Sequence, residues 1–209
     1  MRNTDAAGTT GVVLAAGGGT RLGRGPKALL PYRGRPLVES VAAALLDGGC
    51  REVVVVLGAG AVDVQAAAGL DRCRTVLNPD WRSGMGSSLL LGNATADARD
   101  HLMVALVDQP GVTAATVRRL LAAHRPGRVT AAAYDGGAAA NEDGGRGLRR
   151  GHPLVIDAVL RQAVADTVTG DAGARAFLRA HPELVDPVDC SDLSSGLDVD
   201  APEHLYLLD

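Results

Sequence analysis

The sequence predicts an α/β fold in which a mostly parallel sheet is covered by helices on both faces. Two observations support this prediction. Short apolar runs alternate with longer stretches of helical periodicity through most of the chain. The 209 residues, of which 46% are hydrophobic and 22% charged, are enough for one compact core and typical of a folded globular protein. We therefore expect one domain spanning residues 1–209.

The expected strands are short runs that are mostly rich in valine, leucine or alanine, and β-branched residues suit a pleated, buried strand. They lie at Gly11–Ala15, Glu52–Leu57, Arg74–Leu77, Met103–Val107, Arg128–Ala133 and Leu184–Val188. In a parallel sheet the loops that follow the strands meet at one edge. The functional residues are therefore expected directly after the strands.

The expected helices fill the stretches between the strands. In one of them, Val117, Leu120 and Leu121 fall on a single helical face, and Thr113 before it is typical of an N-cap. The helices are expected at Leu37–Asp47, Val62–Ala68, Ser87–Ala96, Thr113–His124, Val155–Val164 and Asp171–Ala180. A glycine-rich segment at 134–151 interrupts the pattern and predicts a hairpin or a mobile flap.

Composition excludes several classes of partner. A net charge of −3 and an aromatic content of 2% argue against nucleic-acid binding and against an anionic membrane surface. Cys50, Cys73 and Cys190 are odd in number and lack metal-ligand spacing, which favours a reducing compartment. No stretch is long and apolar enough for a membrane span, and residues 1–10 lack a leader pattern. We expect a cytoplasmic protein whose partners are small molecules.

A run of glycines follows the first expected strand, from Gly17 to Gly19. Glycine lets backbone N–H groups approach phosphate oxygens, and Arg21 and Lys27 add positive charge. The run is not a Walker A loop, because Lys27 follows proline and precedes alanine, and it lacks the third glycine of a dinucleotide fingerprint, which falls at Leu22. A flexible surface turn is the structural alternative. The two cations and the position after a strand favour a binding loop for a triphosphate.

Further motifs continue in order along nearly the whole chain. They are Leu14-Ala15-Ala16-Gly17, Arg21, Gly23, Pro26-Lys27, Leu30-Pro31, Arg35-Pro36-Leu37, Asn78-Pro79-Asp80-Trp81, Gly84-Met85-Gly86-Ser87-Ser88-Leu89, Asp108-Gln109-Pro110, Gly151-His152-Pro153, Gly170-Asp171-Ala172-Gly173-Ala174-Arg175 and Asp198-Val199-Asp200-Ala201-Pro202-Glu203. This ordered set resembles the MobA-like NTP transferases, the molybdopterin nucleotidyltransferases. The resemblance implies a Rossmann-like three-layer sandwich with the nucleotidyltransferase fold.

The first motif also suggests which nucleotide is used. Chains with Leu-Ala-Ala-Gly at the first strand resemble the molybdenum cofactor cytidylyltransferases, whereas guanylyl-transferring relatives usually have Leu-Ala-Gly-Gly. Since position 16 is Ala16, the resemblance favours CTP and implies transfer of CMP to molybdopterin with release of pyrophosphate. It also implies transient contact with a molybdoenzyme or its chaperone. The expected nucleotide-binding residues are Leu14, Ala15, Ala16, Gly17, Gly18, Gly19, Arg21, Lys27, Asn78, Gly84, Ser87 and Ser88.

Carboxylates at strand ends suggest a site for Mg²⁺, which prefers oxygen ligands. Asp108 directly follows the strand Met103–Val107, and Asp198 and Asp200 alternate around one residue, so that both point to one side of an extended backbone. We expect all three to bind the metal, although a turn or cap role stays open for Asp198 and Asp200. Lys27, Arg21 and Asp108 are the expected catalytic residues.

Residues in the later motifs are expected to bind the acceptor. These are His152, Asp171 and Arg175. The structural alternatives are a polar loop histidine, a helix cap and a solvated surface cation.

Two other functions stay open. One is transfer to a different phosphorylated small molecule, such as a sugar phosphate, a polyol phosphate or phospholactate. The other is an oxidoreductase or nucleotide-binding relative that lacks transfer activity, because a fold does not determine a function.

Overall fold

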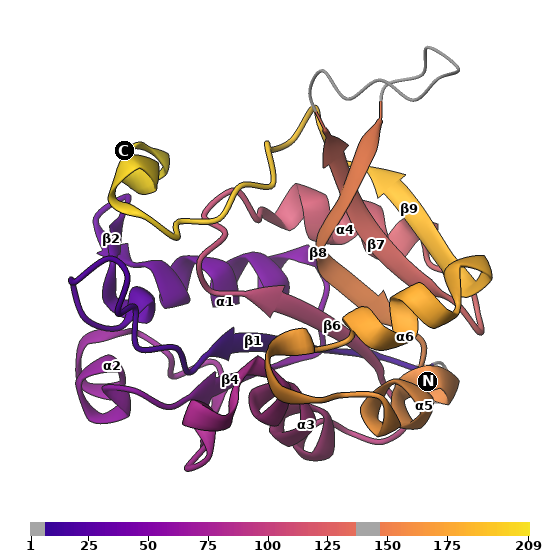
Figure 1. The fold of residues 1–209 in the computed structure, drawn as a ribbon, viewed down its shortest axis with the longest axis horizontal. Helices are drawn as coiled ribbons and strands as arrows, with labels where there is room; N and C mark the ends of the chain where they lie inside the picture. Colours follow the sequence, from indigo (N-terminus) through magenta and orange to yellow (C-terminus); the bar gives the residue numbers. More distant parts are fainter. Residues whose placement is uncertain (1–6, 137–146) are drawn as a thin grey trace, which may run out of the picture.

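A computed structural model describes residues 7–136 and 147–209 and shows three layers, with a seven-stranded sheet between two layers of helices (Figure 1). The strand order is β5-β4-β1-β6-β8-β7-β9. Within the described ranges β8 is the only strand of this sheet that runs antiparallel to its neighbours. The predicted α/β sandwich with a mostly parallel sheet is confirmed. The strands are β1 (Thr9–Ala15), β4 (Glu52–Leu57), β5 (Arg74–Leu77), β6 (His101–Leu106), β7 (Val129–Asp135), β8 (Leu148–Ile156) and β9 (Val185–Asp189), and β2 (Pro31–Tyr32) and β3 (Arg35–Pro36) pair separately.

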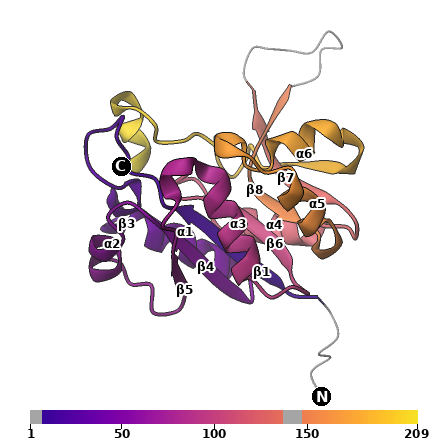
Figure 2. The same ribbon diagram turned by 60° about the horizontal axis from the view of Figure 1, so that its bottom comes forward.

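Helices cover both faces of the sheet, as Figure 2 shows from a second direction. One layer contains α1 (Leu37–Gly48), α2 (Ala61–Ala67) and α4 (Ala114–Ala123), and the other contains α3 (Met85–Thr95), α5 (Arg161–Asp166) and α6 (Arg175–Ala180). Successive strand residues point to opposite faces, so the two layers rest on alternate side chains of the same strands.

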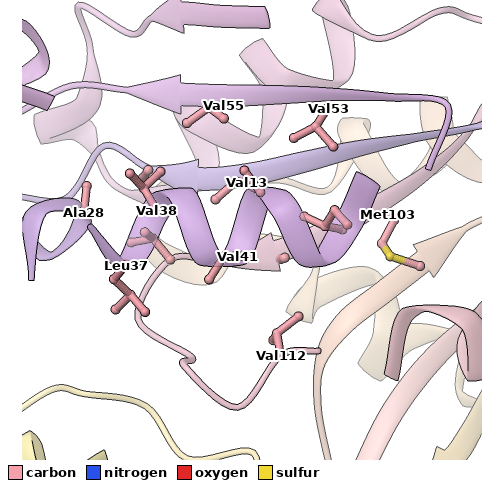
Figure 3. Packing of buried hydrophobic residues seen from close by; sticks show 14 of the residues in the cluster. Val13, Ala28, Leu37, Val38, Val41, Val53, Val55, Met103 and Val112 are labelled. Carbon is pink, nitrogen blue, oxygen red and sulfur yellow. The ribbon is translucent and has the colours of Figure 1, made fainter. Parts of the chain in front are cut away.

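The alternation is clearest in the central strands. Val13 and Val55 belong to the core beneath α1, whereas Val12 and Val56 belong to the core beneath α3. All four valines are 0% exposed, so these strands are buried on both faces as expected for a parallel sheet. Figure 3 shows the α1 side of this packing, where side chains of the helix meet those of β1 and β4.

Most element boundaries lie within two residues of the predicted ones, and Thr113 caps α4 by accepting a hydrogen bond from the Thr116 backbone N–H. Two predictions were wrong around strand β8. Val155 and Ile156, expected to begin a helix, end strand β8, and the following helix α5 starts only at Arg161. Strand β8 was not predicted, because its first half is rich in charge and glycine and lacks an apolar pattern.

The helix expected at Asp171–Ala180 begins later than predicted. Residues Gly170–Ala172 form a short 3₁₀ turn, and α6 starts at Arg175. Gly173 lies between the two with φ +52° and ψ −134°, a backbone conformation that interrupts the helix and that glycine adopts without strain.

The glycine-rich segment 134–151 includes the last two residues of β7 and the first four residues of β8. β7 and β8 pair antiparallel from Val129 with Ile156 to Asp135 with Leu148. Residues 137–146 of the predicted flap lie outside the described residues. Across the part of the chain that the structure describes, no helix combines the length and the apolar character needed to cross a membrane.

Close packing of α3 on β1 depends on Gly92. A Cβ atom built on Gly92 would lie 2.4 Å from Cγ1 of Val12, well inside van der Waals contact. The helix can approach the central strand this closely only because residue 92 has no side chain.

Replacing Gly92 by alanine is therefore expected to destabilise the protein. Alanine has the better helix propensity by about 1 kcal/mol, but overpacking in a core costs roughly 1–3 kcal/mol, so we expect a net loss. Urea unfolding of Gly92→Ala measures the change in the free energy of unfolding. Gly69→Ala is the matched control, because its Cβ would meet Glu39 at 3.4 Å, an ordinary contact. Equal stability of the two variants would contradict this account of the α3–β1 contact.

Candidate active site

The glycine-rich loop leaves the carboxyl end of β1 and folds back on itself. Gly19 has φ +61°, and a Cβ there would lie 2.2 Å from the Gly25 carbonyl oxygen, so only glycine fits. The Leu22 N–H donates to the Gly19 carbonyl at 3.0 Å and closes the turn. At Gly17, by contrast, a Cβ would meet no atom within 4 Å. The backbone at Gly17 is therefore open to a ligand.

This loop lines a cavity of about 640 Å³, a size that suits a nucleotide-sized ligand. The residues that line the cavity come in part from the carboxyl ends of β1 and β6 and from the start of α3. Figure 1 labels these three elements. Of the predicted residues it includes Leu14, Ala16, Gly17, Gly19, Lys27, Gly84, Ser88, Asp108 and Asp171. Six residues that also line it were not among the predicted site residues, namely Thr20, Trp81, Arg82, Met85, Leu106 and Val107. Trp81 lies within a quoted motif, so its position gave a usable signal.

Lys27 joins the loop region to two carboxylates. Its Nζ donates to Asp108 Oδ2 at 2.7 Å and also to Asp200 Oδ1. Burial alone would lower the pKa of Lys27, but the two carboxylates outweigh it and the pKa is raised. The ammonium therefore stays charged at neutral pH and faces the cavity.

The two carboxylates respond differently to their surroundings. Burial raises the pKa of Asp108, and Lys27 offsets this only in part. The pKa of Asp200 is lowered, chiefly by its hydrogen bond from Lys27, and the charge of Arg21 also contributes. Arg21 itself is exposed on the loop. The predicted catalytic residues thus lie in one electrostatic cluster.

One oxygen of Asp108 has no assigned partner. Asp108 Oδ1 is buried and accepts no hydrogen bond from any residue that the structure describes. Asp198 has no contact with Lys27 among the described interactions, and its Oδ1 accepts from Gln109 Nε2 at 2.6 Å. The structure thus places Asp108 and Asp200 together through Lys27 and gives Asp198 a different partner. The predicted three-carboxylate metal site stays a prediction.

Asn78 organises the start of α3. Its Nδ2 donates to the hydroxyl groups of Ser87 and Ser88, both at 2.9 Å, while its Oδ1 accepts from the Asp80 N–H. Asn78 is 3% exposed, so its buried amide connects the loop after β5 to the helix by hydrogen bonds. Ser88 lines the cavity, whereas Asn78 supports it from behind.

Asp171 acts as a helix cap, although not for its own helix. Its Oδ1 accepts from the Met85 N–H at 3.1 Å, at the first residue of α3. The approach is close, since a Cβ on Gly84 would lie 2.5 Å from the Gly170 carbonyl carbon. The turn Gly170–Ala172 therefore docks on the start of α3 and forms part of the cavity wall.

A second cavity of about 320 Å³ adjoins the first, and Leu106 lines both. It contains a concentration of positive charge from β8 and α6, contributed by Arg149, Arg150, Arg175 and Arg179. Within the described residues none of these guanidinium groups forms an ion pair. Uncompensated like charges oppose folding, so their grouping around a cavity indicates an anionic ligand.

Two further groups characterise the second cavity. Burial, followed by the charge of Arg175, lowers the pKa of His152 to about 4, so its imidazole is neutral at physiological pH. Gln109 is 4% exposed, and its Oε1 has no hydrogen-bond donor among the described residues. The predicted residues His152 and Arg175 thus meet here, together with Arg149, Arg150 and Arg179, which sequence reasoning missed. The spacing of Arg175 and Arg179, four residues apart, was the available signal.

Comparison with known proteins gives a family match and two informative relatives. The MobA-like NTP transferase domain matches residues 11–185. Over 208 residues, covering 100% of both chains, the protein is 61% identical to the nicotine blue oxidoreductase of Paenarthrobacter nicotinovorans. It is 40% identical over 117 residues to the molybdenum cofactor guanylyltransferase of Xanthomonas euvesicatoria pv. vesicatoria, covering 54% of this chain and 53% of that protein.

Solved structures give the same fold over nearly the whole chain. A nucleotidyl transferase from Methanothermobacter thermautotroptrophicus has a TM-score of 0.80 at 27% identity and covers 98% of this chain and 97% of its own. A Mycobacterium tuberculosis protein in complex with manganese has a TM-score of 0.76 at 27% identity and covers 97% of this chain and 98% of its own.

The Lys27–Asp108 pair gives a stability test. Lys27→Met leaves the Asp108 carboxylate half-enclosed without its neighbouring cation, and we expect the free energy of unfolding to fall by about 1–3 kcal/mol. Asp108→Asn in the same background removes the stranded charge and should restore at least half of that loss. Urea unfolding of the wild type, both single variants and the double variant measures this cycle. A double variant as unstable as the sum of the singles would show that the pair is not coupled.

Proposed function

This chain belongs to the MobA-like NTP transferase family, and on that premise we propose that it transfers CMP from CTP to molybdopterin with release of pyrophosphate. One observation carries the proposal. Lys27 is held between Asp108 and Asp200 beneath an open glycine loop, in a cavity that adjoins an arginine-lined one. A cation beside a glycine loop suits a triphosphate, and a neighbouring basic cavity suits a phosphorylated acceptor.

The first cavity binds the nucleotide under this proposal. Backbone N–H groups of the loop, the Lys27 ammonium and the exposed Arg21 guanidinium offset the charge of the triphosphate. Ala16 is 6% exposed at the end of β1, where a small side chain leaves room for the nucleotide. The preference for CTP rests on this alanine.

Asp108 also suits a divalent cation. Its Oδ1 is a buried carboxylate oxygen without a hydrogen-bond donor among the described residues, and it lines the nucleotide cavity. We propose that Asp108 and Asp200 hold Mg²⁺. Asp198, the third predicted ligand, lies in the segment that is joined to Asp108 by the hydrogen bond from the Val199 N–H to the Asp108 carbonyl at 2.8 Å. When bound, the cation offsets negative charge on the reacting phosphates.

The transfer step needs positioning more than proton transfer. An oxygen of the acceptor phosphate forms a bond to the α-phosphorus, and the bond from that phosphorus to the β-phosphate oxygen breaks, so pyrophosphate leaves with its electron pair. A phosphate monoester is largely ionised at neutral pH, so no side chain has to remove a proton. Arg175 and the other three arginines hold the acceptor, and neutral His152 contributes a hydrogen-bonding group rather than charge.

The same site accommodates a related acceptor. A sugar phosphate, a polyol phosphate or phospholactate carries the phosphate that the arginine cavity requires, and the chemistry at the α-phosphorus is unchanged. If molybdopterin is the acceptor, the product has to reach a molybdoenzyme or its chaperone, and we propose transient contact with such a partner in the cytoplasm.

A second candidate function is favoured by one specific observation, the 61% identity over the whole chain to a nicotine blue oxidoreductase. In that case the glycine loop would hold the pyrophosphate of a reduced nicotinamide dinucleotide, which supplies a hydride to nicotine blue. The glycine run lacks the third glycine of the dinucleotide fingerprint, and Asp108 would place a negative charge near the pyrophosphate. The geometry therefore favours nucleotidyl transfer, while the identity favours oxidoreduction.

Two assays on one preparation separate these functions. Pyrophosphate release is measured with Mg²⁺ and CTP, GTP, ATP or UTP, with and without molybdopterin. Oxidation of NADH or NADPH is measured with and without nicotine blue. Release of pyrophosphate with CTP only when molybdopterin is present supports the proposal. Dinucleotide oxidation dependent on nicotine blue, with no pyrophosphate release, would replace it with the second function.

The variant Asp108→Asn distinguishes nucleotidyl transfer from hydride transfer. We expect it to lower kcat for nucleotidyl transfer at least about 100-fold, because it removes charge from the position where phosphate charge develops. Hydride transfer should be unchanged or faster, since a negative group beside the pyrophosphate is lost. Asp63→Asn, an exposed carboxylate in α2, is the matched control and should change neither reaction. Full transfer activity of Asp108→Asn at saturating Mg²⁺ would contradict the assignment.

The arginine cavity makes a separate prediction. The double variant Arg175→Ala, Arg179→Ala should raise the KM for the acceptor roughly 10-fold or more and leave the KM for CTP within about twofold, because charge-assisted hydrogen bonds to phosphate are lost. Steady-state kinetics with each substrate varied in turn measure both constants. Arg72→Ala, an exposed arginine outside both cavities, is the control. A parallel rise in both KM values would show that the cavity does not serve the acceptor alone.

A further inference from the structure

A histidine and carboxylate cluster lies at the edge of the sheet opposite the nucleotide cavity. His101 is the first residue of β6, His124 follows α4, and Asp157 follows β8. Strand β8 runs antiparallel to β6 and pairs Ile156 with Leu102, which brings Asp157 beside His101. We propose that these three side chains form a binding site for a transition-metal ion of the Zn²⁺ class, separate from the catalytic cation.

The distances suit a metal better than hydrogen bonds. His101 Nδ1 and His124 Nε2 each lie 3.4 Å from Asp157 Oδ2. A charge-assisted hydrogen bond between nitrogen and a carboxylate oxygen is shorter, at about 2.7–2.9 Å. A tetrahedral zinc ion bonded at about 2.0–2.2 Å to each ligand separates the ligand atoms by roughly 3.3–3.6 Å. Both observed separations match an edge of such a tetrahedron.

The two histidines are also close enough to each other to bind one ion. One ligand atom from each of the three residues lies within 4.8 Å of the other two, and the imidazole rings meet at 68° with their centroids 4.7 Å apart. Small side-chain rotations therefore bring both nitrogens to bonding distance from one ion. Among the residues that the structure describes, no other group of three histidine, cysteine or acidic side chains converges in this way.

His124 supplies independent evidence for a ligand. Its side chain is 7% exposed, and Nε2 has no hydrogen-bond partner among the described residues. A buried, unpaired ring nitrogen is costly unless a ligand satisfies it. The other ring nitrogen, Nδ1, lies 2.9 Å from Oγ1 of the fully buried Thr130. When Nδ1 donates its hydrogen to that hydroxyl, Nε2 carries the free lone pair that a metal requires.

Backbone N–H groups donate hydrogen bonds to the other two ligands, Asp157 and His101. Asp157 Oδ1 accepts from the Val159 N–H at 3.0 Å, which orients the carboxylate and leaves Oδ2 facing the histidines. His101 Nδ1 accepts from the Ala158 N–H at 3.1 Å. Metal binding at that nitrogen replaces this part-buried hydrogen bond with a metal bond. We expect His101, whose side chain is the most exposed of the three, to be the last ligand to bind.

The donor set selects the class of metal. Two neutral imidazoles and one carboxylate suit Zn²⁺, Co²⁺ or Ni²⁺, whereas Mg²⁺ prefers oxygen ligands and keeps several waters. The site connects the end of α4 with the first residue of β6 and the residue after β8. An ion there would cross-link three elements and stabilise the folded state by binding it preferentially.

The test uses the full chain, treated with EDTA and exchanged into chelator-free buffer. Co²⁺ is titrated while the visible absorption is recorded, and Zn²⁺ is then added to displace it. We expect one equivalent of Co²⁺ to give the intense bands of a four-coordinate site, and Zn²⁺ to raise the Tm by several degrees. His124→Ala should weaken Co²⁺ binding about 100-fold or more and abolish the Zn²⁺-dependent rise in Tm.

Controls separate this site from others. His181→Ala should leave Co²⁺ binding unchanged, because His181 and Glu183 also lie 3.4 Å apart but are exposed and offer only two ligands. Asp108→Asn should likewise keep the signal, since it alters only the nucleotide cavity. Asp157→Asn keeps the backbone cap and is the second variant if His124→Ala does not fold. Weak six-coordinate bands, or equal Co²⁺ affinity in the wild type and in both ligand variants, would overturn the proposal.

Discussion

Burial of strand β1 on both faces determines where the candidate site residues at its carboxyl end lie. Val12 and Val13 are fully buried under opposite helix layers, and the contact at Gly92 brings α3 directly onto the strand. This packing on both faces fixes the position of β1 in the sheet. The glycine loop that follows the strand is therefore held at the carboxyl edge of the sheet. β6 runs parallel beside it, with Leu14 opposite Leu106, and so delivers Asp108 to the same edge. The geometry of the candidate site follows from this register.

Lys27 adds the electrostatic link that the backbone does not provide. It connects the loop region with Asp108 after β6 and with Asp200 near the C-terminus, three segments far apart in the sequence. A nucleotide that enters the cavity has to share this ammonium with the carboxylates. A divalent cation on Asp108 would release Lys27 toward the phosphates, since the carboxylate would then have another positive partner. Binding of the metal and of the nucleotide are therefore expected to support each other.

The predictable parts of the structure are those with a local signal. Valine-rich runs identified β1 and β4, and the rule that strand ends share one edge placed Lys27, Asp108 and the glycine loop together. Strand β8 gave no such signal, because charged residues and glycine form its first half, and Arg149 and Arg150 were missed with it. His101, His124 and Asp157 lie 23 and 33 residues apart, without a motif, and only the antiparallel pairing of β8 with β6 brings the first and last together.

The family and the relative that is 61% identical point to different reactions, and the glycine loop alone does not decide between them. A glycine loop binds phosphates whether they belong to a triphosphate or to a dinucleotide, so the first cavity alone does not choose. The choice depends on the groups around the phosphates. Asp108 and Asp200 hinder a dinucleotide that binds without metal, but they assist a triphosphate that brings one. Their placement on Lys27 is the physical reason to favour nucleotidyl transfer despite the high identity to an oxidoreductase.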